Sequence, residues 1–212
     1  AADPFEDALI AYTRGDYATV LKLIHPLADQ GNARAQFNLG IMYDKGQGVQ
    51  QDYSEAVKWY RLAAEQGDAR AQNNLGIMYD RGRGVPRDNA EAVKWYRLAA
   101  DQGNAAAQYS LGVLYDHALG VPQNYAEAVR WYRLAADQDY TPAQVGLGVM
   151  YENGRGILQD YVFAYMWFNL VAAKSGLLAD VAVGSRDSVV KNMTPSQIAE
   201  AQKLAREWKP KQ

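Results

Sequence analysis

The stretch that decides the fold covers residues 67–102 and reads GDARAQNNLGIMYDRGRGVPRDNAEAVKWYRLAADQ. Its pattern returns, with few changes, before and after it. A Leu-Gly pair recurs at a step of 36 residues, and a tyrosine and a tryptophan keep the same step. A fixed period of this size is typical of a solenoid, in which each repeat covers the apolar faces of its neighbours. The leucines of the four pairs are Leu39, Leu75, Leu111 and Leu147.

Each repeat is predicted to hold two helices. Over residues 71–79, Ala71, Leu75 and Tyr79 lie four apart on one helical face. Residues 92–99 follow the i, i+3, i+4, i+7 pattern of an amphipathic helix. Between them, the glycines of residues 82–86 permit positive φ, and the proline there cannot extend the first helix. We therefore expect a helix, a glycine loop and a second helix.

The start of each second helix carries a chemical signal. Asp52, Asp88 and Asn124 each precede a glutamate by three residues. This is the spacing of a capping box, in which both side chains satisfy free backbone N–H groups. In the fourth repeat, Thr141 followed by Pro142 predicts an N-cap with proline at the first position of that repeat's first helix.

The glycine of each Leu-Gly pair lies inside a predicted helix, where it costs about 1 kcal/mol relative to alanine. We expect the paired helix to approach closely at this point, with its tryptophan and small alanines against the glycine. Burying each tryptophan contributes about 2–3 kcal/mol, which outweighs the cost of the glycine. The tryptophans concerned are Trp59, Trp95, Trp131 and Trp167.

Four elements recur in a fixed order: A-x-x-x-L-G-x-x-Y, G-x-G-V-P, D/N-x-x-E-A-V-x-W-Y and A-A-x-Q-G. Together they resemble Sel1-like repeats, which are relatives of the tetratricopeptide repeat with a longer loop between the helices. The resemblance covers residues 32–173 strongly. It implies an all-α fold, a right-handed α-α superhelix (solenoid), which serves as an adaptor for protein–protein contacts, often in bacterial envelope or signalling systems. It does not imply catalysis.

The chain is predicted to be one repeat array over residues 1–212. A tetratricopeptide-like helix pair occupies residues 1–31, where Pro26 is expected to kink or shorten the second helix. Four Sel1-like repeats follow at residues 32–67, 68–103, 104–139 and 140–175. Residues 176–212 are predicted to be capping helices, at 177–192 and 195–208. The second of these is expected to begin with Thr194 as N-cap and Gln197 reaching back to it.

The composition and the start of the chain limit the kinds of partner and the cellular compartment that we expect. The net charge of −2 gives no polybasic signal for nucleic acid or an anionic membrane. No apolar run approaches the roughly 18–20 residues that span a bilayer. The absence of cysteine excludes disulfides and thiolate metal sites within this sequence. The start at Ala1-Ala2 resembles the product of signal peptidase, so we expect a periplasmic or secreted protein; a trimmed cytoplasmic chain is the alternative.

No catalytic, cofactor-binding or metal-binding residues are predicted. His25 and His117 are the only histidines and lie in different repeats. The recurring carboxylates are explained as helix caps rather than as paired acids and bases. The glycine loops lack the preceding strand and the Gly-Lys-Ser/Thr of a phosphate loop. The Trp-Tyr pairs at helical spacing favour a packed core over a stacking platform for bases.

The remaining candidate is the concave wall, which the first helices build in a solenoid. The resemblance to tetratricopeptide repeats places on it the residues five and two before each Leu-Gly leucine, one before it and two after it. In the first three repeats these are Arg34, Phe37, Asn38, Ile41, Arg70, Asn73, Asn74, Ile77, Ala106, Tyr109, Ser110 and Val113. The fourth repeat adds Val145 and Val149, and Lys45, Arg81 and His117 are expected at the rim.

This wall suits a protein or peptide partner. Asn38 and Asn74 could hydrogen-bond a peptide backbone, Arg34 and Arg70 add charge, and Phe37 and Tyr109 add rigid apolar contact. The structural alternative is that both asparagines hold neighbouring repeats together. We therefore expect a non-catalytic scaffold that binds a partner in its groove. The competing hypothesis is a cell-envelope enzyme or enzyme regulator, for example one acting on cell-wall peptides, that uses the solenoid as a platform.

Overall fold

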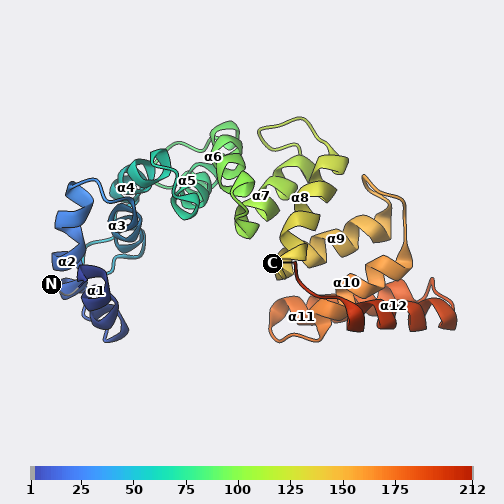
Figure 1. Cartoon of the computed structure of the whole chain (residues 1–212). Coiled ribbons are helices and arrows are strands. Elements are labelled where there is room, and N and C mark those ends of the chain that lie inside the picture. Colours follow the sequence, from blue (N-terminus) through green and yellow to red (C-terminus); the bar gives the residue numbers. More distant parts are fainter. Residues whose placement is uncertain (1–2, 212) are drawn as a thin grey trace. The chain divides into compact units, whose positions relative to one another are not determined.

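The computed structural model describes residues 3–211, and the expectation drawn from Ala1-Ala2 lies outside them. Over the described residues the chain forms twelve α-helices and no strands (Figure 1). The all-α fold class is therefore confirmed. The helices divide between two compact units, residues 1–104 and 105–212.

Within each unit, consecutive helices up to the eleventh pack against each other, as in an α-solenoid. The helices of the first unit are α1 (Pro4–Thr13), α2 (Tyr17–Asp29), α3 (Ala33–Lys45), α4 (Tyr53–Glu65), α5 (Ala69–Arg81) and α6 (Asn89–Asp101). Those of the second unit are α7 (Ala105–Asp116), α8 (Tyr125–Asp137), α9 (Thr141–Asn153), α10 (Tyr161–Ala172), α11 (Leu177–Val190) and α12 (Pro195–Glu207).

The helix-start signals are confirmed in part. Asp52, Asp88 and Asn124 each accept hydrogen bonds from backbone N–H groups of the first turn. The glutamate three residues later does not close a capping box, because Glu55 and Glu91 bind Lys58 and Lys94 instead. Only Thr194 and Gln197 form the reciprocal box among the helices described.

The structure differs from the expectations at two prolines. Helix α2 continues through Pro26 to Asp29 instead of ending early. In the fourth repeat Tyr140, not Thr141, is the N-cap of α9, and it makes no side-chain capping bond. The Thr141 hydroxyl instead accepts a hydrogen bond from Lys174 at 2.9 Å, so it links α9 to the chain segment after α10.

The glycine inside each first helix does meet the paired helix, but a different ring lies against it. A Cβ on Gly40, Gly76 or Gly112 would lie 2.5 to 2.6 Å from the ring of the tyrosine that follows each tryptophan. Those rings belong to Tyr60, Tyr96 and Tyr132, and Phe168 takes the same place opposite Gly148. The expectation that tryptophan packs there was therefore wrong: Trp59 is only partly buried, whereas Tyr60 is fully buried.

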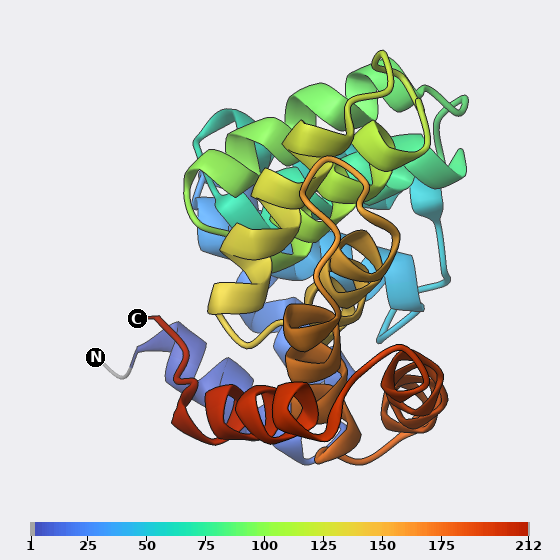
Figure 2. The same ribbon diagram turned by 90° about the vertical axis from the view of Figure 1, so that its right-hand side faces the viewer.

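The last two helices depart from the repeat geometry. Helix α12 packs mainly against α10, where Trp208 meets Trp167 edge to face at 5.8 Å between ring centroids. Figure 2 shows α11 almost end-on while α12 lies across the view, so these helices do not pair as the repeats do. Gly184, which continues the glycine series, accordingly has no atom within 4 Å of an added Cβ.

Candidate binding site

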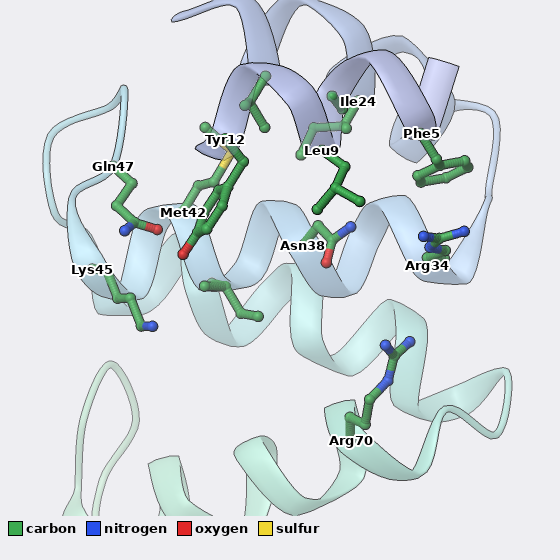
Figure 3. Close-up of a pocket in the computed structure, with 13 residues that line it drawn as sticks. Phe5, Leu9, Tyr12, Ile24, Arg34, Asn38, Met42, Lys45, Gln47 and Arg70 are labelled. Carbon is green, nitrogen blue, oxygen red and sulfur yellow. The ribbon is translucent and has the colours of Figure 1, made fainter. Parts of the chain in front are cut away.

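A pocket of about 300 Å³ lies in the first unit. Figure 3 shows α1 lying over α3, with the pocket between them and Arg70 of α5 reaching toward it. Its lining divides into an apolar part and a polar part. The apolar residues are Phe5, Ala8, Leu9, Tyr12, Val20, Ile24, Ile41 and Met42. The polar residues are Arg34, Asn38, Lys45, Gln47 and Arg70, with no carboxylate among them.

The pocket lies beside α1, which packs mainly against α2. Ala8 and Ala11 of α1 pack into the core with α2, whereas Leu9 and Tyr12 are exposed. Leu9 keeps 61% of its surface exposed and Tyr12 keeps 42%. In Figure 3 both side chains point from α1 toward α3. Exposed apolar side chains over a polar helix face are the combination found in ligand sites, where apolar contact supplies affinity and polar groups supply orientation.

The arginines at the pocket are each fixed over an aromatic ring. The Arg34 guanidinium lies 4.4 Å from the centroid of Phe5, and that of Arg70 lies 4.4 Å from the centroid of Phe37. Arg70 is also held by Asp68, with Nη2 at 2.6 Å from Oδ2. Arg34 and Lys45 form no ion pair with any residue of the described range. Their charges are therefore available to a ligand, whereas that of Arg70 is already engaged.

Asp68 has a second role as the N-cap of α5, where it accepts from the backbone of Arg70 and Ala71. Burial raises the pKa of Asp68, but hydrogen bonds from Arg70 and Ala71 outweigh it, so the net shift is downward. The carboxylate therefore stays ionised near neutral pH and holds the Arg70 side chain in place.

The two asparagines of the predicted wall have different surroundings. Asn74 hydrogen-bonds the hydroxyl of Tyr60 and accepts from Asn73. Asn38 is half-buried, lines the pocket and makes no side-chain hydrogen bond within residues 3–211. The structural alternative thus describes Asn74, while Asn38 keeps its donor and its acceptor for a ligand.

A further unused acceptor lies at the other end of the pocket. Gln47, in the loop after α3, donates from Nε2 to the Tyr17 hydroxyl at 3.2 Å. Its Oε1 is buried and has no hydrogen-bond partner in the described structure. Figure 3 shows this oxygen on the side of Gln47 that faces Tyr12. A buried acceptor without a donor is costly.

The other predicted wall residues do not join this pocket. Phe37 and Asn73 are buried, at 8% exposure each, and Asn74 and Ile77 are half-buried on α5. The remainder lie in the second unit, where Tyr109 packs against Tyr132 and Tyr140 at 5.7 Å between centroids. Those second-unit residues are Ala106, Tyr109, Ser110, Val113, Val145 and Val149, all half-buried. Arg81 and His117 are exposed.

The residues that α1 and the first loop contribute to the pocket were not predicted from the sequence. Phe5, Leu9, Tyr12 and Gln47 line the pocket, yet none of them was predicted to bind. Helix α1 has no Leu-Gly pair, so the repeat register could not be extended to it. One available signal was the presence of Leu9, Ile10 and Tyr12 together on a helix outside the repeat pattern.

No group of three or more histidines and carboxylates suited to a metal ion occurs within residues 3–211. His25 pairs with Asp29 at 3.0 Å on α2, and His117 lies 3.7 Å from Asp116 in the second unit. Within the same residues, none of the helices combines the length and the apolar character of a membrane span.

Four Sel1 repeats match the family model, at residues 33–68, 69–104, 105–140 and 141–175, which together exceed half of the chain. The chain belongs to the Sel1 repeat family. The Sel1 repeat fold commonly serves as a protein-interaction scaffold, and the superfamily is generally non-catalytic. The boundaries of the matched repeats differ by at most one residue from the repeat boundaries given in the sequence analysis.

Solved structures give the same result for this Sel1 repeat protein. It is similar to c5321, a protective antigen of uropathogenic Escherichia coli with an SLR fold, at 36% identity and a TM-score of 0.82. That alignment covers 89% of this chain but only 40% of the other, longer chain. A Sel1 repeat protein from Oxalobacter formigenes is 33% identical, with a TM-score of 0.75 and coverage of 90% and 86%. A search of curated protein sequences gave no match.

Proposed function

We propose that this Sel1 repeat protein is a non-catalytic scaffold that binds a segment of a partner protein at the pocket between α1 and α3. The observation that carries the proposal is the pairing of exposed apolar side chains on α1 with unengaged polar groups on α3. Leu9 and Tyr12 supply the first kind of contact, and Arg34, Asn38 and Lys45 supply the second. Interfaces of this composition combine apolar anchors with hydrogen-bonding groups that fix the orientation of the partner.

Photo-crosslinking with single-residue resolution tests this proposal. Tyr12 is replaced by p-benzoylphenylalanine, which is close to it in shape, and the protein is irradiated in an extract of its source cells. The matched control carries the same group at Leu98, which is similarly exposed, at 48%, on α6. We expect a discrete protein adduct from the Tyr12 position that is absent from the Leu98 position.

The adduct must also depend on the polar groups of the pocket. Arg34→Ala and Asn38→Ala, each combined with the crosslinker at Tyr12, are expected to reduce its yield. Both substitutions keep a good helix former on α3, so the fold is retained and circular dichroism checks this. Equal adducts from both crosslinker positions, or yields unchanged by both substitutions, would overturn the proposal.

The non-catalytic part of the proposal has its own test. The purified protein is incubated with cell-wall peptides and with a chromogenic β-lactam, since hydrolases of these substrates are the competing class. We expect no turnover above a buffer blank. Turnover that survives repurification would favour the platform hypothesis instead.

A further inference from the structure

We propose that the pocket recognises an internal, extended peptide segment in which two acidic residues flank one large aliphatic residue, in the order acidic, spacer, aliphatic, spacer, acidic. This inference rests on the proposed function and names the chemistry of the partner. Three observations carry it: the charges at the pocket, the unused amide groups and the distances along α3.

The charges select an anionic ligand. Arg34 begins the α3 side of the pocket and Lys45 ends it, and neither is neutralised by a carboxylate of the described chain. The charge of Arg70 is paired with Asp68, and no aspartate or glutamate lines the pocket. A cationic rim around an apolar floor attracts carboxylates and disfavours lysine-rich segments.

The amide groups select a peptide over a fatty acid or another anionic amphiphile. The Asn38 amide lines the pocket and has both a free donor and a free acceptor. A peptide bond supplies an N–H and a C=O together and can satisfy both groups of Asn38. A fatty acid has no N–H, so it would leave the acceptor of Asn38 unpaired.

The spacing along α3 sets the pattern of the peptide. Arg34 and Lys45 are eleven residues apart, which corresponds to about 16 Å along a helix, with Asn38 between them. In an extended peptide, residues four apart lie on one face about 13 Å from each other. The long side chains of arginine and lysine can cover the remaining difference. The residue midway between the two acids then faces the same way, toward Leu9, Ile24 and Ile41.

The probe is the fluorescein-labelled peptide Gly-Asp-Ser-Leu-Ser-Asp-Gly with an amidated C-terminus, titrated with the full protein by fluorescence anisotropy. Two control peptides replace both aspartates by lysine or the leucine by alanine. We expect binding of the first peptide only, weakened when NaCl is raised from about 0.05 M to about 0.5 M. Equal binding of the lysine peptide would overturn the inference.

Variants of the protein locate the contact. Arg34→Ala is expected to weaken binding about tenfold, since a charge-assisted hydrogen bond is lost. Its matched control is Arg83→Ala, because Arg83 also lies over a ring, 5.5 Å from the centroid of Tyr53, but outside the pocket. The double variant Arg34→Glu, Lys45→Glu is expected to exchange the preference and bind the lysine peptide. Retained preference for the aspartate peptide in that variant would contradict the inference.

Two competitors distinguish the source of the negative charge. Decanoate that displaces the probe as well as the unlabelled peptide does would identify an anionic amphiphile as the ligand and overturn the inference. A peptide that binds only with a free C-terminal carboxylate would also overturn it, because internal acids would then be dispensable. An adduct at Tyr12 without binding of the probe would leave the scaffold function standing and reject this ligand pattern alone.

Discussion

At the residue scale, the contact between a helical glycine and an aromatic ring recurs in every Sel1 repeat. The ring lies where a Cβ would be, and the tyrosine hydroxyl then reaches polar groups of its own repeat and of the next one, as Tyr60 reaches Asp44 and Asn74. Burial is the largest cause of the raised pKa of Tyr60, so this hydroxyl stays protonated and can donate. The conformational cost of glycine is thus offset by close packing of a large ring.

The first prediction compares two glycines at the same repeat position. Gly76→Ala is expected to destabilise the protein by about 1–3 kcal/mol, because its Cβ would lie 2.6 Å from Tyr96. Gly184→Ala is expected to stabilise it by about 0.5–1 kcal/mol, since α11 has open space there. Urea unfolding followed by circular dichroism measures both, and equal effects would contradict the packing described.

A second residue-scale feature is a paired exchange in the fourth repeat. Asp139 takes the place of a loop glycine at φ 63°, and Lys174 takes the place of a recurring glutamine. Lys174 Nζ lies 2.7 Å from Asp139 Oδ1. Burial raises the pKa of Asp139, but hydrogen bonds from Lys174 and Gln144 outweigh it, so the net shift is downward. Because the folded pKa is depressed, the stabilisation is present above the unfolded pKa and is lost as pH falls through the folded value.

The second prediction follows from the lowered pKa of Asp139. Asp139→Asn keeps a residue that tolerates positive φ but removes the charge. We expect this variant to be less stable than the parent protein at neutral pH, with the difference shrinking as the pH falls below about 4. The midpoints of urea unfolding of both proteins, measured at neutral pH and below about pH 4, check this. A difference that persists unchanged in acid would show that the charge plays no part.

At the element scale, buried glutamines connect each helix pair to the preceding one. Gln72 donates to Ala64 O at 3.1 Å and accepts from Gln102 Nε2 at 2.8 Å. Gln36 makes the same two contacts with Ala28 O and Gln66. One side chain therefore satisfies a carbonyl at the end of the previous repeat and binds the end of its own second helix.

The third prediction concerns this link. Gln72→Leu is expected to destabilise the first unit by about 1–3 kcal/mol, because the Ala64 carbonyl loses its side-chain donor and Gln102 loses its acceptor. Gln102→Ala should have a smaller effect, since Gln102 is exposed. The free energy of unfolding from urea titrations measures both. The reverse order would mean that the buried glutamine is dispensable.

The fourth prediction separates the two residues of the expected capping box. Asp88→Ala is expected to destabilise the protein by about 1 kcal/mol, because the N–H groups of Ala90 and Glu91 lose their acceptor. Glu91→Ala should have a smaller effect, since Glu91 pairs with exposed Lys94 instead of capping the helix. Thermal unfolding of both variants tests this, and equal losses would restore the reciprocal box.

Much of this level of structure could be predicted from the sequence. The 36-residue period fixed the helices, and the Asx residues fixed their starts, because both signals are local. The glutamine contacts were not predicted, although Gln36, Gln72, Gln108 and Gln144 recur at the same period. From the sequence alone, a recurring polar residue is interpreted as a surface residue, because its burial is not visible there. Likewise, periodicity marks both Trp95 and Tyr96 as apolar but does not decide which ring faces the glycine.

At the scale of the whole molecule, the candidate site lies at α1, outside the four Sel1 repeats. Arg34, Asn38 and Ile41 were predicted from the repeat register and do line the pocket. The predicted equivalents in later repeats face other packed helices or other residues, as Asn74 does. The pocket forms at α1 because this helix lacks the repeat pattern and leaves Leu9 and Tyr12 uncovered.

The fifth prediction addresses the other end of the array. Stability in repeat arrays is close to a sum of each repeat and its nearest neighbours. Removing residues 195–212 uncovers α10, including Trp167, and should destabilise the second unit selectively. Hydrogen exchange is expected to speed up in α9 and α10 while α3 and α4 keep their protection. Uniform loss of protection along the chain would contradict this.

The loop glycines have a consequence for how such proteins change length. A Cβ on Gly48 would lie 2.8 Å from the Tyr17 carbonyl oxygen, and one on Gly84 would lie 2.3 Å from that of Tyr53. The backbone of each of these loops thus packs against the backbone at the start of the helix that lies one period earlier. Inserting or deleting part of a period would break this contact. A change of length that keeps these contacts therefore adds or removes complete 36-residue modules.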